Sequence, residues 1–395
     1  MRHLFLLVLV APPLVLATAP ARLCVARAGS GDPSADGELF VDPERGKDGA
    51  PGTERKPLRS ISAALASLPE PLAESVTIHL AGGTYATTGG VGMPERSLAL
   101  MLRMRPGVTV SLVGSESEPV VLAWDGDRRM IEATEGTWRL ARLRVGSFSK
   151  EQRRGVQVTG PAHVILEDVS FRLRSDSDVG ILASDGGRVS LRGAIRLNEN
   201  LHDEAEEESF CGMLATDHGV IEFDEHQGSS LELGNGSLAA RHYGRIRLGC
   251  ETARITCWTQ SNDLSIGNSG RIDLADTTTT LCAKRRDNTP VGLEDDGHVL
   301  GEGAHLRLIG PNDSAIALQK ASTFTCNDIE LVGEFGYTIW ARSGSLFVGR
   351  FLGDVTKLEA RTGASIHVEK LGGTVRGEVS VASGGLVSLP DRVVR

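Results

Sequence analysis

Residues 38–85 read ELFVDPERGKDGAPGTERKPLRSISAALASLPEPLAESVTIHLAGGTY. Ile61, Ala64, Leu65 and Leu68 fall at i, i+3, i+4 and i+7, which is one face of a short helix. Ser60 stands at the N-cap position of that helix. Short strands are predicted on either side, at 39–41 and 76–80, with a Gly- and Pro-containing turn between the first strand and the helix. A helix with one apolar face must cover another surface, and the open end of a stack of strands is such a surface.

The rest of the chain repeats a unit of short alternating strands. Ala133, Val158 and Ala183 are each 25 residues apart, and Trp138, Val164 and Val189 follow at nearly the same step, 26 and 25 residues apart. Further units are predicted to begin at 213–215, 237–239, 264–266, 316–318, 338–340, 357–359 and 379–381. A coil of this kind buries its apolar face only against the next coil, so the pattern predicts an all-β solenoid of roughly 11–12 coils.

The first segment also carries a family resemblance. The matching residues are Val41, Asp42, Gly46, Asp48, Gly52, Thr53, Pro57, Ser60, Ile61, Ala64, Leu65, Val76, Ile78, Gly83 and Tyr85. The segment resembles the N-terminal cap and first rung of the pectate-lyase-like superfamily. This resemblance implies a right-handed parallel β-helix with a short capping helix. It implies little about activity, because lyases, esterases, hydrolases, epimerases and phage tail proteins share the cap.

The N-terminus has the pattern of an export signal. Arg2 and His3 precede an apolar run at 4–16, and Ala26-Arg27-Ala28 is a cleavage pattern, with Ala19-Pro20-Ala21 as a rival. We therefore predict a signal peptide at 1–28, an N-terminal strand and capping helix at 29–75, and the β-helix at 76–395. The expected location is secreted, periplasmic or at the cell surface. No later stretch reaches membrane-spanning length.

The net charge and the cysteine spacing limit the kinds of ligand that the sequence predicts. The formal net charge of −9 argues against non-specific nucleic-acid binding. The absence of C-x-x-C pairs argues against a zinc site. Cys257 and Cys282 are 25 residues apart, one coil by the local spacing, which permits either a disulfide or a ladder of buried reduced thiols.

One polar column follows the repeat. Arg128, Arg153 and Asp178 each lie five residues before an anchor, and Arg154 and Asp176 stand close beside them. These five residues are the predicted ligand-binding candidates. Asp176, Asp178 and Asp203 are secondary candidates for calcium, which takes oxygen ligands, and no other cofactor is expected. The competing interpretation is that these charges belong to ordinary solvated turns.

Two other groups of residues bear on function. Asp295-Asp296-Gly297-His298 resembles, faintly, the aspartate pair and Gly-His of polygalacturonases, but here the residues are contiguous in one turn, which favours a solvated turn. Trp258, Trp340 and Tyr337 are candidates for stacking on sugar rings if they are exposed. At least one of the two tryptophans is expected in the core.

The sequence leaves three functions open. The preferred hypothesis is an exported, non-catalytic β-helix that binds a polysaccharide, a cell-surface glycan or another extended ligand along its repetitive face. The first alternative is a polysaccharide lyase or related enzyme that acts on an acidic polysaccharide through the Arg/Asp column. The second alternative is a structural scaffold similar to phage tail proteins.

Overall fold

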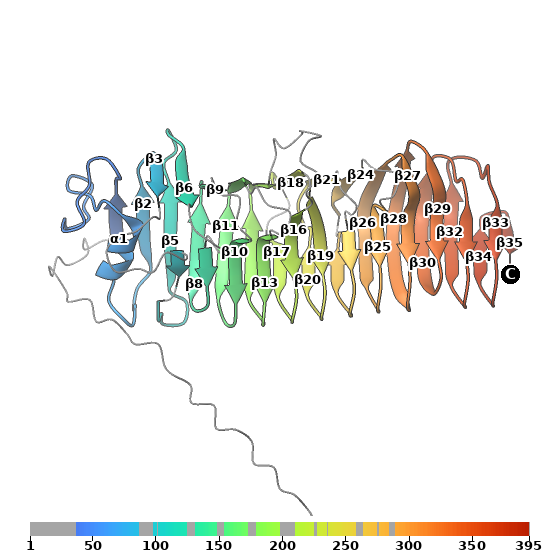
Figure 1. Ribbon diagram of the computed structural model, residues 1–395, viewed down its shortest axis with the longest axis horizontal. Helices are drawn as coiled ribbons and strands as arrows, with labels where there is room; N and C mark the ends of the chain where they lie inside the picture. Colours follow the sequence, from blue (N-terminus) through green and yellow to red (C-terminus); the bar gives the residue numbers. More distant parts are fainter. Residues whose placement is uncertain are drawn as a thin grey trace, which may run out of the picture. The chain divides into compact units, whose positions relative to one another are not determined.

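The computed structural model describes residues 37–86, 98–100, 102–124, 131–147, 154–172, 179–197, 210–224, 227–234, 236–257, 264–274, 276–283 and 289–394. This part of the chain is an all-β parallel solenoid with one short helix near its N-terminus, and the strands follow one another along the stack in chain order (Figure 1). The predicted fold class is confirmed. The predicted signal peptide lies outside the described residues.

The described strands form two sheets. Sheet 1 contains β1 (Glu38–Val41), β2 (Val76–Leu80), β3 (Gly83–Ala86), β5 (Thr109–Gly114), β6 (Val120–Trp124), β8 (Thr137–Ala141), β9 (Arg144–Ser147), β11 (His163–Glu167), β12 (Ser170–Arg172), β14 (Arg188–Arg192), β15 (Ala194–Leu197), β17 (Val220–Phe223), β18 (Ser230–Gly234), β20 (Arg245–Arg247), β21 (Thr252–Cys257), β23 (Arg271–Asp273), β24 (Thr278–Ala283), β26 (His298–Ile309), β28 (Ser322–Val332), β30 (Gly344–Leu352), β32 (Ser365–Leu371), β34 (Leu386–Leu389) and β35 (Arg392–Val394). Sheet 2 contains β4 (Leu98–Leu100), β7 (Ile131–Ala133), β10 (Arg154–Thr159), β13 (Val179–Ser184), β16 (Phe210–Ala215), β19 (Gly236–Ala240), β22 (Leu264–Ile266), β25 (Val291–Leu293), β27 (Asn312–Leu318), β29 (Phe335–Ala341), β31 (Leu358–Ala360) and β33 (Val379–Val381).

The capping helix α1 spans Ile61–Ser67. Ser60 is its N-cap, because the Ser60 hydroxyl accepts a hydrogen bond from the backbone N–H of Ala63 at 3.1 Å. Ile61 and Ala64 are buried, and Leu65 is half-buried against the core. The helix contacts β1, so its apolar face covers the first strands as predicted.

The predicted 25-residue period is confirmed by the strand register. Val158 lies between Ala133 and Ala183 in sheet 2, and Val164 lies between Trp138 and Val189 in sheet 1. All these side chains are buried, so equivalent positions stack into one core along the solenoid. Burial of this apolar surface is the main force that holds coil on coil.

The predicted register is wrong at three later strands by one residue. The units predicted at 237–239, 338–340 and 357–359 begin one residue later, and the strand β25 was not predicted at all. A shift of one residue exchanges the two faces of a strand. Trp340 therefore points outward, opposite Ala317 and Glu359, and is not a core residue.

The predicted equivalence of Cys257 and Cys282 is also wrong by one residue. Thr256 faces Cys282 across β21 and β24, and Cys257 faces Ala283. Neighbouring residues of a strand point to opposite faces, so the spacing of 25 did not mark equivalent positions.

Among the described residues, no helix has the length and apolar character that crossing a membrane requires.

Candidate functional site

The predicted Arg/Asp column reaches the described part of the chain at one residue, Arg154. Arg128, Arg153, Asp176, Asp178 and the calcium candidate Asp203 lie outside the described residues. Arg154 opens β10 and is the register neighbour of Val179 in β13. In the sequence, Arg153 and Asp178 are the residues directly before Arg154 and Val179, which pair with each other. The column itself stays a prediction. Among the described residues, no group of three or more His, Cys, Asp and Glu side chains is placed to hold a metal ion.

A different set of polar residues lies where sheet 2 passes into sheet 1. We call the stacked turns at 217–219, 242–244, 268–270, 295–297 and 320–322 the turn ridge. Each turn begins with two successive residues of positive φ, from Asp217 and His218 at 49° and 65° to Lys320 and Ala321 at 49° and 63°. Two left-handed residues in a row form a tight turn of the hairpin type, which Asn, Asp and Gly adopt most readily.

The third residue of the first four ridge turns is glycine, and the reason is close contact between coils. A Cβ on Gly244 would lie 2.1 Å from the carbonyl oxygen of Ala215, and one on Gly270 would lie 2.1 Å from that of Ala240. Backbone hydrogen bonds then join successive turns, including Tyr243 N–H to Asn268 O at 3.2 Å and Ser269 N–H to Asp295 O at 2.9 Å. Backbone contacts therefore hold the successive ridge turns against one another.

Tyr243 is the most unusual residue of the ridge. Its φ is 65°, a conformation that costs an ordinary L-residue about 1–2 kcal/mol, and its side chain is 60% exposed. The ring of His218, one coil earlier, stacks on it with centroids 5.2 Å apart and planes 5° from parallel. The positive φ is shared by all the ridge turns, but Tyr243 alone among the described ridge residues combines it with a large, exposed hydrophobic side chain, which contributes little to packing. This combination points to function.

His242 ties three turns together beside Tyr243. Asn268 Nδ2 lies 3.3 Å from His242 Nε2, and His242 Nδ1 lies 3.2 Å from Thr216 Oγ1. Thr216 Oγ1 in turn donates to Asp217 Oδ2 at 3.1 Å. With the Asn268 amide donating to Nε2, Nδ1 carries the proton and donates to Thr216. This chain of hydrogen bonds fixes the His242 ring as one wall of the site.

The ridge residues enclose a shallow cleft of about 510 Å³. Its lining is His242, Tyr243, Asn268, Ser269, Asp295, Asp296 and Lys320. Lys320 Nζ and Asp295 Oδ1 pair at 2.8 Å on one side. The cleft combines one aromatic ring with amide, hydroxyl and carboxylate groups, so it offers both a surface for stacking and groups for hydrogen bonding.

Other chemically active side chains are placed less well. Burial raises the pKa of the Cys250 thiol to about 12 and that of Cys326 to about 12, so neither is a thiolate nucleophile near neutral pH. Arg342 lies 4.6 Å from the centroid of the half-buried Trp340 ring, and Lys357 Nζ lies 4.4 Å from that of Tyr337. These rings already have cationic partners, and Trp258 lies outside the described residues.

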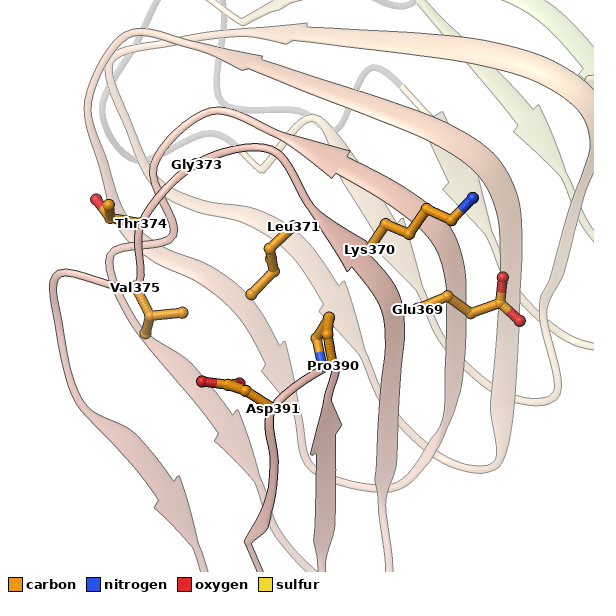
Figure 2. Close-up of a pocket in the computed structure, with 8 residues that line it drawn as sticks. All are labelled: Glu369, Lys370, Leu371, Gly373, Thr374, Val375, Pro390 and Asp391. Carbon is orange, nitrogen blue, oxygen red and sulfur yellow. The ribbon is translucent and has the colours of Figure 1, made fainter.

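A second depression, of about 620 Å³, lies at the C-terminal end of the solenoid. Figure 2 shows Leu371 and Val375 pointing into it, while the charged ends of Glu369 and Lys370 point away. Its floor is the half-buried apolar surface of the last coils. It holds no cluster of polar groups aimed at one point, so the smaller cleft on the ridge is the better functional candidate.

The sequence prediction treated the 295–298 turn as solvated and missed the remainder of the ridge. The signal was present: Gly219, Gly244, Gly270 and Gly297 are 25, 26 and 27 residues apart, and each follows two non-glycine residues. Asp295 and Asp296 are solvent-accessible, as predicted, and they also line the cleft.

Comparisons with known proteins add little beyond the architecture. No family model matches the sequence, and no curated protein matches it. Two crystal structures of the GH136 lacto-N-biosidase from Eubacterium ramulus, a selenomethionine derivative and the native protein, are similar in structure. Both are 10% identical in sequence, with TM-scores of 0.32 and 0.31; the match covers 89% and 88% of this chain and 68% of theirs. Because both TM-scores are below 0.5, the function is inferred from this chain's own residues.

Proposed function

We propose that this protein is an exported, non-catalytic β-solenoid that binds a glycan in the cleft of the turn ridge. The observation that carries the proposal is Tyr243, an exposed aromatic side chain on a backbone of positive φ, which lines a cleft together with polar side chains. Pyranose rings present C–H groups on their faces and hydroxyl groups on their edges. An aromatic ring surrounded by hydrogen-bonding groups complements both.

The polar lining fits hydroxyl recognition. Asp296 offers carboxylate oxygens as acceptors, and the exposed edges of Asn268 and Lys320 offer further acceptors and donors. The backbone contacts described above hold these groups in place before a ligand arrives. A preorganised site loses less conformational entropy on binding. Export accords with the predicted signal peptide, and placement in the pectate-lyase-like superfamily is proposed on the N-terminal motif alone.

The test is a glycan array followed by titration calorimetry on the best-binding glycan. Tyr243→Ala is expected to weaken binding at least tenfold, which corresponds to about 1.4 kcal/mol of binding free energy. Phe347→Ala is the matched control, because Phe347 is also exposed (41%) and stacked on a histidine, His367, but lies on sheet 1 away from the cleft. Both variants should keep the wild-type melting temperature.

Three results would contradict the proposal. One is an array on which the wild-type protein binds no glycan, and another is unchanged affinity in Tyr243→Ala. The third is release of shortened or unsaturated products from the bound glycan, which would indicate an enzyme. The lyase alternative rests on Arg153 and Asp178, so Arg153→Ala in the same product assay tests it.

A further inference from the structure

The shape of the cleft restricts which part of a glycan can enter it. Tyr243, Ser269 and Asp296 occupy the same position, the second residue, in three successive ridge turns. His218 covers one face of the Tyr243 ring, so the other face is directed toward the next coil. At that coil the position is filled only by the small side chain of Ser269. A slot one coil wide therefore opens between Tyr243 and Asp296.

The slot matches the thickness of one sugar ring. Adjacent coils are about 4.8 Å apart, so the turn positions of Tyr243 and Asp296, two coils apart, are separated by about 9–10 Å. That distance admits one pyranose ring in van der Waals contact with Tyr243. The carboxylate of Asp296 then lies on the far side of the ring, within reach of its hydroxyl groups.

One side of the slot is closed by the first residues of the same turns. His242 Nε2 and Asn268 Nδ2 are 3.3 Å apart, and Asp295 and Lys320 pair at 2.8 Å, so these side chains form a wall along the cleft. The floor is the backbone of the 268–270 turn. An internal residue of a chain has two glycosidic bonds leaving opposite edges of its ring. A ring in this slot has room for only one.

We infer that the ridge cleft recognises a single terminal pyranose residue, inserted between Tyr243 and Asp296, and not the interior of a polysaccharide chain. The inference rests on the proposed glycan-binding function and specifies the class of ligand: glycans that share the same terminal residue. The core of the glycan extends away from the protein and contributes little to affinity.

The first experiment is a glycan array that carries two sets of oligosaccharides. Members of the first set share a terminal residue but differ in the core, and members of the second set share a core but differ in the terminal residue. Hits are expected to sort by terminal residue, and the methyl glycoside of that residue should compete with them. Hits that sort by an internal sequence overturn the inference while leaving glycan binding intact. An array without hits overturns the proposed function instead.

The second experiment fills the slot. Ser269→Tyr places a ring where Tyr243 shows that a tyrosine is tolerated, since Ser269 has φ 60° and Tyr243 has φ 65°. Binding should fall at least tenfold. Ala321→Tyr is the control, because Ala321 (φ 63°) holds the same turn position one coil beyond Asp296, outside the slot. Wild-type affinity in Ser269→Tyr, or an equal loss in Ala321→Tyr, contradicts the slot. If Ser269→Tyr does not fold, the array sets still decide.

Discussion

Charged side chains line both the turn ridge and the outer face of sheet 1, but they are arranged differently. On sheet 1 they pair across neighbouring coils, as Arg139 does with Glu167 at 2.8 Å and Arg192 with Asp224 at 3.0 Å. The ridge also has a pair of this kind, Lys320 with Asp295 at 2.8 Å, but no described cation lies within ion-pair distance of Asp296.

The difference indicates two uses of the same repeat. Residues directly opposite each other on adjacent strands lie close enough for opposite charges to stabilise the stack. On the sheet face, several anions have a cation beside them on the neighbouring coil, and these pairs contribute to stability. On the ridge, stability comes from backbone hydrogen bonds and glycine contacts, so side chains such as Tyr243 and Asp296 remain available to a ligand.

The strongest test of this comparison is removal of a sheet-face partner. Arg139 and Glu167 are only 30% and 25% exposed, and Arg139 donates two hydrogen bonds to the carboxylate. Arg139→Ala leaves that carboxylate without its partner in a partly desolvated position, and we expect a loss of about 1–3 kcal/mol in unfolding free energy. Urea unfolding of Arg139→Ala, Glu167→Ala and the double variant measures the coupling. Independent, additive losses would show that the pair is not a stabilising contact.

A smaller effect is expected from pH. The hydrogen bond from Arg139 lowers the pKa of Glu167 below its usual value of 4.5. The folded state therefore binds the Glu167 proton less tightly than the unfolded state, so this stabilisation is complete above pH 4.5 and is lost as the pH falls through the folded pKa. The stability difference between wild type and Glu167→Gln should shrink as the pH is lowered below about 4.5. A difference that stays constant down to about pH 3 would contradict this assignment.

The smallest effect on stability is expected on the ridge itself. Lys320 and Asp295 are 64% and 38% exposed, so their ion pair is screened by water and salt. Lys320→Ala should lower the unfolding free energy much less than Arg139→Ala does, and added salt should reduce that loss further. If Lys320→Ala destabilises the protein as much as Arg139→Ala does, the ridge is part of the structural framework and the distinction between the two regions fails. Parallel urea titrations at low and high salt provide the measurement.

The sequence alone was sufficient for the solenoid and its cap. Apolar residues such as Val158 and Val164 recur because each coil buries the same face, and that periodicity is visible without coordinates. Ser60 and the face of α1 were found in the same way, since capping and helical periodicity depend on neighbours within a few residues. Such signals can be recognised in the sequence because they either lie within one short segment or recur at a nearly constant spacing.

Tertiary structure decided the register in detail and the position of the site. Trp340 faces outward because the coils stack β29 one residue away from the predicted register. The repeat length itself varies by a residue or more from coil to coil, so spacing in the sequence does not fix the register to a single residue. Tyr243, Ser269 and Asp296 are 26 and 27 residues apart and have no common residue type, so what links them in the sequence is the glycine that follows each of them. They form one cleft because the coils stack about 4.8 Å apart and the turns adopt left-handed backbone angles. Both facts depend on contacts between coils, and a linear sequence does not display those contacts.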